Sequence, residues 1–258
     1  MGWTQSKALS RVCRAWNTGV VIGNLLYRAR LAWFSLKEAL FLRRHATRAA
    51  RFAAIYGRRL WGAGEESASG EGSSLVATAA ARSGLAGLIA AHHVGSILDA
   101  PCGDCHWIAQ VSFAGDYRGV DIVPELIAAN RTRHTGPGRS FAVADIVNDP
   151  VPPADLVLCR ECLNHLPLAD GRAALANLAA AAGKLLVVTH HPAIIENGDQ
   201  AASFRFRRLN LTLPPFGLRA PDALIDEGEW AEGKTLAVWD MARGGPFAGV
   251  IAGIHSHM

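Results

Sequence analysis

Three aspartates in the middle of the chain each stand at the end of a short apolar segment: Asp99, Asp121 and Asp145. If these segments are parallel strands, the carboxylates lie at one edge of a sheet, where α/β proteins bind ligands. Asp121 follows the turn at Asp99–Asp104 by about 20 residues, a spacing at which a carboxylate accepts hydrogen bonds from both ribose hydroxyls. Asp145-Ile146 suits the amino group and ring face of an adenine. The pattern predicts a nucleoside ligand; the alternatives are a helix cap for Asp121 and a turn for Asp145.

Side chains that can accept a proton follow the next two apolar segments: Glu161, His165, His190 and His191. His165 stands four residues after Glu161, so a helical segment would place both on one face and let the carboxylate orient the imidazole. Such groups could take a proton from a hydroxyl during group transfer. We therefore predict catalytic roles for Glu161, His165 and His190, with His191 as a further candidate. The alternative for each histidine is a packed or surface role.

Four of the five cysteines form two Cys-x-x-Cys pairs, Cys102 with Cys105 and Cys159 with Cys162. A four-thiolate zinc site or a redox pair are the functional alternatives. The 53 residues between the pairs greatly exceed the spacing of a zinc ribbon, and a metal there would compete with the nucleoside for the same crevice. We expect reduced, buried thiols and no metal, as is typical of a cytoplasmic protein.

The elements that must position these residues alternate along the chain. A length of 258 residues, with half of them apolar and 19% charged, excludes a disordered or disulfide-scaffold protein. Helices are expected at 74–91, 105–113, 124–133 and 169–182, and strands at 96–100, 117–122, 141–145, 155–160 and 184–190. This alternation predicts an α/β, doubly wound (Rossmann-like), mostly parallel sheet.

The first 60 residues differ in charge from the rest, because they contain 12 Lys and Arg but only one acidic residue, Glu38. Apolar and arginine positions alternate with helical period over about 31–56, with Gly57 as a stop. Residues 16–56 could contact an anionic membrane surface, led by Trp16, Trp33 and Phe34; the alternative is an ordinary docked helix. Arg28 and Arg30 interrupt the apolar stretch, so we expect neither a spanning helix nor a secretory signal. No nucleic-acid-binding module accompanies the basic run.

The chain resembles the class I S-adenosylmethionine-dependent methyltransferases in four segments: ILDAPCGD (97–104), YRGVDIVPELI (117–127), the FAVADI stretch and ADLVLCRECLNHLP (154–167). It is similar more narrowly to a bacterial subgroup with DAPCGD, LCR-x-CL-x-HL and LNLxLPPF motifs, whose members often occur in glycan or polysaccharide gene clusters. The glycine-rich turn departs from the usual D-x-G-x-G-x-G pattern, because only the middle glycine remains, as Gly103. Pro101 and Asp104 in this turn suit a ligand without phosphates, which argues against a nicotinamide enzyme.

The resemblance implies a seven-stranded sheet with an antiparallel edge strand at 235–241, S-adenosylmethionine as cofactor, and a small-molecule or glycan acceptor. The cofactor-binding residues are then Asp99, Ala100, Pro101, Cys102, Gly103, Asp121, Ile122, Asp145, Ile146 and Arg160. Arg207, Asn210 and the Pro214-Pro215 turn fall in a substrate-side loop. An arginine and an asparagine there suit a polar or anionic acceptor, with loop anchoring as the alternative.

We therefore expect four segments: a basic helical arm (1–56), a Gly/Ser-rich linker or active-site segment (57–73), a methyltransferase domain (74–241) and a C-terminal tail (242–258). The expected function is methyl transfer to a sugar or glycan hydroxyl. The alternatives are a non-catalytic cofactor-binding or scaffold member of the fold, and a zinc or thiol redox protein. The expected location is cytoplasmic, with peripheral contact to the inner membrane through the arm. His255 and His257 are read as a frayed terminus, not a metal site.

Overall fold

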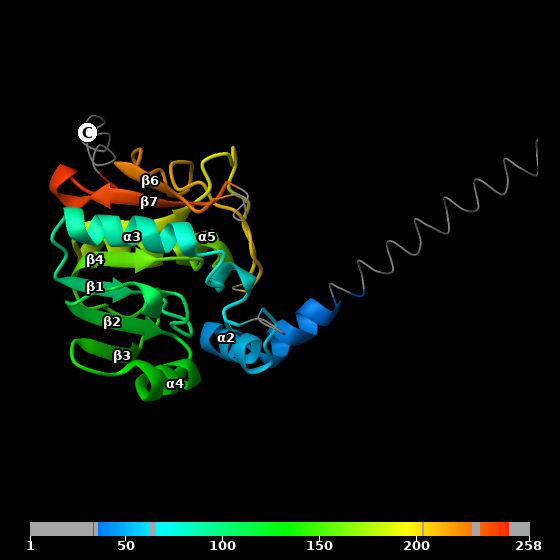
Figure 1. Cartoon of the computed structure of the whole chain (residues 1–258). Helices are drawn as coiled ribbons and strands as arrows, with labels where there is room; N and C mark the ends of the chain where they lie inside the picture. Colours follow the sequence, from blue (N-terminus) through cyan, green and yellow to red (C-terminus); the bar gives the residue numbers. More distant parts are fainter. Residues whose placement is uncertain (1–32, 34–35, 62–65, 203, 229–232, 248–258) are drawn as a thin grey trace, which may run out of the picture. The chain divides into compact units, whose positions relative to one another are not determined.

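The computed structural model describes residues 33, 36–61, 66–202, 204–228 and 233–247 (Figure 1). The chain divides into two compact units, residues 1–46 and 47–258. In the smaller unit, residues 36–44 are helical. The larger unit contains the sheet and all the elements labelled below. Trp16, Phe34, His255 and His257 lie outside the described residues.

The larger unit is built on a seven-stranded sheet with the order β3-β2-β1-β4-β5-β7-β6. The strands are β1 (Ser96–Asp99), β2 (Asp116–Asp121), β3 (Arg139–Val143), β4 (Ala154–Cys159), β5 (Ala182–His190), β6 (Ala223–Asp226) and β7 (Thr235–Asp240). Strands β1 to β5 pair in parallel, and β7 runs antiparallel to both β5 and β6. The predicted doubly wound, mostly parallel sheet is confirmed.

The predicted edge position of 235–241 is wrong, because β6 pairs with the outer side of β7 and forms the edge. Residues 235–239 are all buried, as expected for an inner strand. Strand β6 escaped prediction because it has only four residues, and three of them are exposed. A short, exposed strand lacks the apolar pattern by which strands are recognised.

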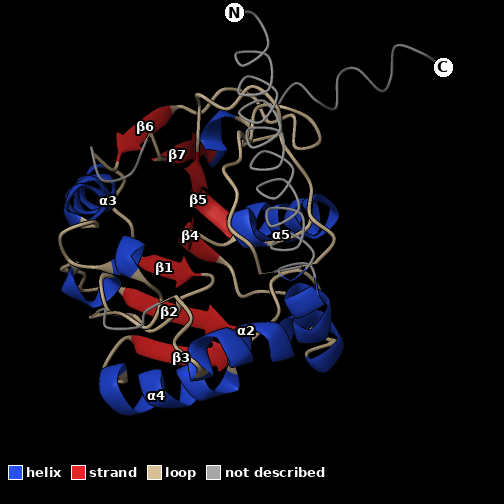
Figure 2. Cartoon of the chain, turned by 90° about the vertical axis from the view of Figure 1, so that its right-hand side faces the viewer, coloured by secondary structure: helices blue, strands red, loops and turns tan. Residues whose placement is uncertain are grey.

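Helices cover both faces of the sheet. Helix α3 (Ala79–Ala91) and helix α5 (Leu168–Ala181) lie on opposite sides (Figure 2). Helix α4 (Pro124–His134) packs against β2 and β3 and begins with a proline, whose fixed φ suits the first helical position. Helix α5 buries a face of small and branched side chains, including Ala174, Leu175 and Leu178, against β4 and β5. The core is therefore a three-layer α/β/α arrangement.

Two of the predicted helices differ from the structure. The segment 105–113 contains only a 3₁₀ turn at Ile108–Gln110, because Cys105 has a φ of +58° and the Asp104 carboxylate accepts the His106 N–H. The continuous helix expected over 31–56 breaks at 45–47, where the Thr47 hydroxyl accepts the Ala50 N–H at 3.1 Å. Helix α2 (Arg48–Gly57) begins there, ends at the expected glycine and belongs to the larger unit.

Candidate active site

A cavity lies at the carboxyl ends of β1, β2 and β4, and residues of helix α2 contribute to its wall. In Figure 1, α2 lies beside this edge of the sheet. It has two halves. The half that contains Asp145 is lined mainly by apolar side chains. Its charged lining residues include Arg48, Asp121 and Asp145. The Gly103 half is more polar and includes Ser69, Arg160 and the turn after β1. Both halves share five residues: Tyr56, Trp61, Pro101, Glu161 and His165.

Eight of the ten predicted cofactor residues line this cavity: Pro101, Cys102, Gly103, Asp121, Ile122, Asp145, Ile146 and Arg160. Asp99 and Ala100 are not among the lining residues and are buried. The strand ends therefore do meet at one edge of the sheet, as the sequence predicts.

The turn after β1 is held by side chains of neighbouring elements. Gly103 has a φ of +53°, and a Cβ there would lie 2.6 Å from the Ser69 Oγ, so the close approach of the segment above requires glycine. The Gly103 N–H donates to the Asp121 Oδ2 at 3.1 Å. The Asn130 Nδ2 of α4 donates to the Gly103 carbonyl at 2.7 Å. The turn, which contains a single glycine, is thus held by hydrogen bonds from two neighbouring elements.

Burial raises the pKa of both carboxyl groups at the centre of the edge. The pKa of Asp99 rises to about 7, although the Tyr117 hydroxyl donates to its Oδ2 at 2.7 Å and opposes the shift. The pKa of Asp121 rises to about 6, against hydrogen bonds from the Val123 and Gly103 N–H groups. Asp121 is the one of the two that reaches the cavity. Its carboxylate is thus held by the backbone and poised for a further donor.

Asp145 is engaged from helix α2. The Arg48 Nη1 lies 2.5 Å from the Asp145 Oδ2, and its Nη2 lies 2.6 Å from an oxygen of Asp170 at the start of α5. The Asn148 Nδ2 also donates to the Asp145 Oδ2, at 2.8 Å. Asp145 lies where an adenine contact is predicted, but its carboxylate already has side-chain donors. Sequence reasoning missed Arg48, because nothing in the helical pattern distinguishes it from the other arginines of the basic segment.

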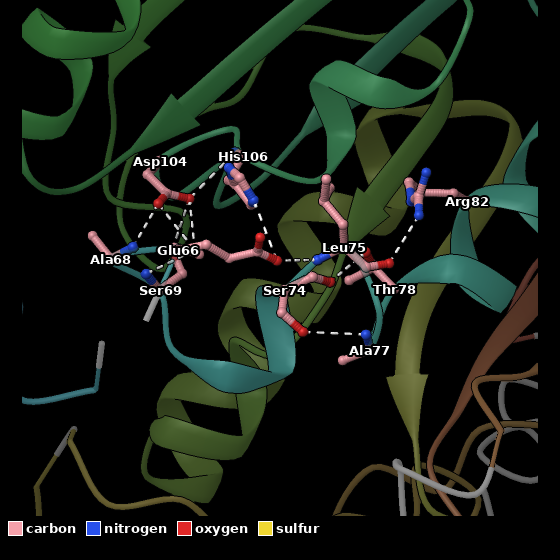
Figure 3. Close-up of polar contacts among 11 residues, drawn as sticks. Glu66, Ala68, Ser69, Ser74, Leu75, Ala77, Thr78, Arg82, Asp104 and His106 are labelled. Carbon is pink, nitrogen blue, oxygen red and sulfur yellow. Dashed lines mark hydrogen bonds and ion pairs between the residues drawn. The ribbon is translucent and has the colours of Figure 1, made fainter. Parts of the chain in front are cut away.

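The Gly/Ser-rich segment contributes Trp61, Ser69, Gly72 and Ser73 to the cavity. Figure 3 shows how it is anchored: the Asp104 carboxylate accepts the Ala68 N–H at 2.7 Å and the Ser67 hydroxyl at 2.9 Å. The Glu66 carboxylate accepts the Leu75 N–H and lies 3.5 Å from the His106 Nε2. The Asp104 carboxylate therefore holds this segment beside the turn after β1.

A buried charge network lies behind Glu161. The Arg160 Nη2 and the Glu227 Oε2 are 2.6 Å apart, and both side chains are almost fully buried. The Lys234 Nζ lies 3.3 Å from the same Glu227 oxygen and 2.9 Å from the Glu161 Oε1. Arg160 also covers the Trp107 ring. The predicted cofactor residue Arg160 is thus committed to an ion pair with a residue near the end of β6, which sequence reasoning did not identify.

Glu161 and His165 both line the cavity, but not as one helical face. Glu161 has a φ of +55°, and its N–H donates to the Thr189 Oγ1, so the chain turns sharply there. Only Leu163–His165 forms a 3₁₀ turn. The predicted orientation of the imidazole by Glu161 is replaced by the pairing of Glu161 with Lys234. Although burial raises the pKa of Glu161, the nearby Lys234 and Arg160 lower it overall.

His165 is positioned by aromatic rings. Its ring lies 4.6 Å from the Trp61 ring and 5.8 Å from the Phe206 ring, centroid to centroid. Its Nδ1 lies 3.4 Å from the Phe204 carbonyl. Burial lowers the pKa of His165, and the nearby Glu161 carboxylate partly opposes this shift. The imidazole is therefore neutral near pH 7, the state that a general base requires.

His190 does not meet the prediction of a catalytic role. It is buried, is not among the lining residues, and its Nδ1 accepts the Leu211 N–H at 3.1 Å. Burial lowers its pKa to about 4. The neighbouring His191 likewise lies outside the lining set, and its Nδ1 faces the Leu209 N–H at 3.4 Å. Both imidazoles therefore anchor the loop after β5. This is a packed role, the alternative to catalysis for each histidine.

The loop residues Arg207 and Asn210 differ from each other. The Asn210 Nδ2 donates to the Ile194 carbonyl at 2.8 Å, and its Oδ1 accepts the Thr212 N–H at 3.0 Å, so its amide anchors the loop rather than facing a substrate. The Arg207 Nη2 donates to the carbonyl of Leu166, a cavity residue, while its Nε and Nη1 are buried without a hydrogen-bond partner. Arg207 itself is not among the lining residues of the cavity.

The cysteine pairs do not join into a metal site. Cys102, Cys105, Cys159 and Cys162 are free thiols and buried. Within the described ranges, no three Cys, His, Asp or Glu side chains group as metal ligands. The Cys105 Sγ lies 3.2 Å from the Tyr117 hydroxyl, and the Asn130 Nδ2 lies 3.6 Å from the Cys102 Sγ. These thiols pack around the turn after β1.

Comparison with known proteins agrees with this fold. Residues 97–183 match a family model described as a methyltransferase domain. The N-methyltransferase NodS from Bradyrhizobium japonicum, in complex with S-adenosylhomocysteine, is 16% identical, with a TM-score of 0.54 over 73% of this chain and 97% of that chain. Magnesium protoporphyrin IX methyltransferase from Synechocystis is also 16% identical, with a TM-score of 0.50 over 72% and 93% of the two chains.

Human N-acetylserotonin methyltransferase is similar to the same degree, at 16% identity and a TM-score of 0.50 over 80% of this chain and 65% of that chain. No curated protein matches the sequence significantly. At these identities the structural likeness concerns the fold, whereas the match over 97–183 concerns the segment from β1 to the start of β5, which contains most of the cavity residues. Residues 97–183 are therefore similar to a methyltransferase domain, and the chain shares its fold with these solved methyltransferases.

Proposed function

We propose that this protein transfers a methyl group from S-adenosylmethionine to a hydroxyl of a small polar acceptor, a sugar or a glycan unit. The observation that carries the proposal is the shared wall of the cavity. Glu161 and His165 border both the half that contains Asp121 and the half that contains Gly103. A donor on the strand edge and an acceptor at His165 would therefore meet at this shared wall, as group transfer requires.

The cavity fits the cofactor in its chemistry. The Asp145 half has the apolar side chains Phe52, Ile122 and Ile146, which suit a purine ring. Asp121 beside them is a carboxylate that can accept from ribose hydroxyls. When bound, the cofactor supplies an electrophilic methyl group on a sulfonium. The protein's part is to hold this group in line with the acceptor and to exclude water.

The residues on the acceptor side of the cavity favour a hydroxyl group as the methyl acceptor. His165 has a lowered pKa and is a neutral base beside the cavity, so it can take the proton that the acceptor oxygen loses as it gains the methyl group. The Trp61 ring stacked on it offers an apolar face, and Glu161 offers hydrogen-bond acceptors at the same wall. An apolar ring face beside polar acceptors is the combination that binds a sugar ring.

Calorimetric titration of S-adenosylmethionine and S-adenosylhomocysteine tests the cofactor site. We expect micromolar binding to the wild type and at least about tenfold weaker binding to Asp121→Asn, which corresponds to about 1.4 kcal/mol. Asp116→Asn is the matched control, because Asp116 is an exposed aspartate at the other end of the same strand. No binding to a folded wild type, or equal loss in both variants, would overturn the cofactor proposal and favour a non-catalytic member of the fold.

Methyl transfer from labelled S-adenosylmethionine tests the acceptor. The panel contains free and nucleotide-linked sugars, amino sugars, catechols and amines. We expect label in a sugar hydroxyl, and loss of that product in His165→Gln. Transfer to an amine in preference to every hydroxyl would contradict the proposed acceptor while leaving the cofactor site standing.

A further inference from the structure

The helix at residues 36–44 in the smaller unit presents large apolar side chains to solvent. Leu36 and Leu40 are 53% and 55% exposed, and Trp33 is 55% exposed. Positions 33, 36 and 40 are separated by three and four residues, the spacing of one helix face. We call these three side chains the apolar arm face. Leucine and tryptophan side chains grouped in this way on a surface mark an interaction site rather than scattered exposure.

Basic side chains border the apolar arm face. Lys37, Arg43 and Arg44 are exposed on the same short segment. The Lys37 Nζ lies 4.8 Å from the centre of the Trp33 ring, so an ammonium group and an indole are presented side by side. The first 60 residues carry 12 Lys and Arg against one acidic residue, a balance of +11, whereas the other 198 residues carry 14 against 21, a balance of −7.

These two properties together specify the chemistry of the partner. A surface of apolar and cationic groups matches the interface of an anionic bilayer, where rings and leucines enter the acyl boundary and ammonium and guanidinium groups meet headgroup phosphates. Nucleic acid would account for the charge but not for the exposed leucines. Among the described residues, no helix has the length and apolar character needed to cross a membrane. An interfacial position, in the plane of the membrane, is the one open to a helix of this kind.

We propose that residues 33–44 dock on anionic lipid bilayers through the apolar arm face and its basic border. The inference is independent of the proposed methyl transfer, since it uses none of the cavity residues. It predicts that binding needs both parts of the surface: leucines for insertion and positive charge for attraction.

Co-sedimentation of the full-length protein with vesicles tests the proposal. The vesicles contain phosphatidylcholine alone, or phosphatidylcholine with about 30% phosphatidylglycerol. We expect binding to the anionic vesicles only, and a reduction of at least about tenfold when salt rises from 0.1 to 0.5 M. Leu36→Glu combined with Leu40→Glu should also reduce binding at least about tenfold. Equal binding to neutral vesicles, or no binding to either vesicle, would overturn the proposal.

Two further variants distinguish binding through the apolar arm face and its basic border from nonspecific effects of substitution on vesicle binding. Ile195→Glu is the control, because Ile195 is 93% exposed in the larger unit and its replacement likewise removes an exposed aliphatic side chain and adds a negative charge. It should bind vesicles like the wild type. The Lys37→Gln, Arg43→Gln, Arg44→Gln triple variant should lose binding to anionic vesicles, with an unchanged melting temperature. Retained binding in the leucine variant or in the triple variant would assign the membrane contact to another part of the chain.

Discussion

The Arg48 guanidinium, at the first residue of α2, lies 2.5 Å from the Asp145 carboxylate after β3 and 2.6 Å from the Asp170 carboxylate at the start of α5. One side chain thereby joins a helix that lines the cavity to the loop after β3 and to helix α5. All three side chains are largely withdrawn from solvent, so the ion pairs are less screened than surface pairs. Helix α2 is therefore held over the proposed adenine end of the site by two charge-assisted contacts.

Removing this contact should loosen the wall of the cavity. In Arg48→Gln, we expect both the association and the dissociation rate constants for S-adenosylhomocysteine to rise by about threefold or more, because α2 is no longer held by its first turn. Stopped-flow fluorescence measures both rates, and Trp61 on the cavity wall provides a signal. Arg58→Gln, an exposed arginine directly after the same helix, should leave both rates unchanged. Unaltered rates in Arg48→Gln would show that α2 does not limit access.

Cofactor affinity should depend on pH through Asp121. Its raised pKa, about 6, means that the carboxyl group is ionised and ready to accept hydroxyl donors above pH 6, and takes up a proton below it. Affinity should therefore be constant at pH 7.5–8.5 and fall as the pH drops through 6. Titration calorimetry between pH 5 and pH 8.5 measures this. In Asp121→Asn the decline around pH 6 should be absent; a decline of the same size in that variant would assign the proton to another group.

The buried Asp99 should reduce stability at neutral pH. The pKa of Asp99 is about 7 in the folded chain and 3.8 in an ordinary environment, so the folded chain binds this proton more tightly. The ionised carboxylate therefore lowers the free energy of unfolding in full above pH 7, and this loss of stability disappears as the pH falls toward 4. Asp99→Asn retains an oxygen that can accept from Tyr117 without the charge. We expect its melting temperature to exceed that of the wild type by about 3 °C or more at pH 8, and by clearly less at pH 5.

The control for this stability change is Asp116→Asn, which removes an exposed carboxylate from the same sheet. It should show no gain at either pH. Thermal unfolding followed by circular dichroism measures all three proteins. A gain for Asp99→Asn that does not vary with pH would mean that the charge of Asp99 is not its cause.

The dependence of kcat on pH should follow the protonation of the His165 imidazole. Because burial lowers its pKa below the ordinary 6.5, kcat for the hydroxyl acceptor should stay level at neutral pH and fall only below pH 6.5. His165→Gln should lower kcat by about 10² to 10⁴-fold, and the acid limb should disappear. The measurement is initial-rate transfer of labelled methyl groups at saturating substrate concentrations. An equal acid limb in the variant would remove His165 from the role of base, whatever the loss in rate.

Much of the fold could be predicted from the sequence because the relevant forces are local or periodic. Strands β4 and β5 contain continuous apolar runs, and α4 and α5 begin at Pro124 and Leu168, within a residue of the prediction. The strand ends bring Asp121, Asp145 and Gly103 to one cavity because parallel strands end at the same edge of a sheet. The meeting of these residues follows from the strand topology alone, so a sequence that predicts the topology also predicts that they meet.

The contacts between distant segments were decided by the tertiary structure. Arg48 meets Asp145 across 97 positions and Arg160 meets Glu227 across 67, and no periodicity relates such pairs. The same holds for His165, which lies against Trp61, and for His190, whose burial assigns it to the loop rather than to the cavity. The apolar segments of the sequence show which residues stand at the strand ends. Whether such a residue faces the cavity or is already in an ion pair depends on tertiary packing, because burial and charge pairing are set by neighbours in space.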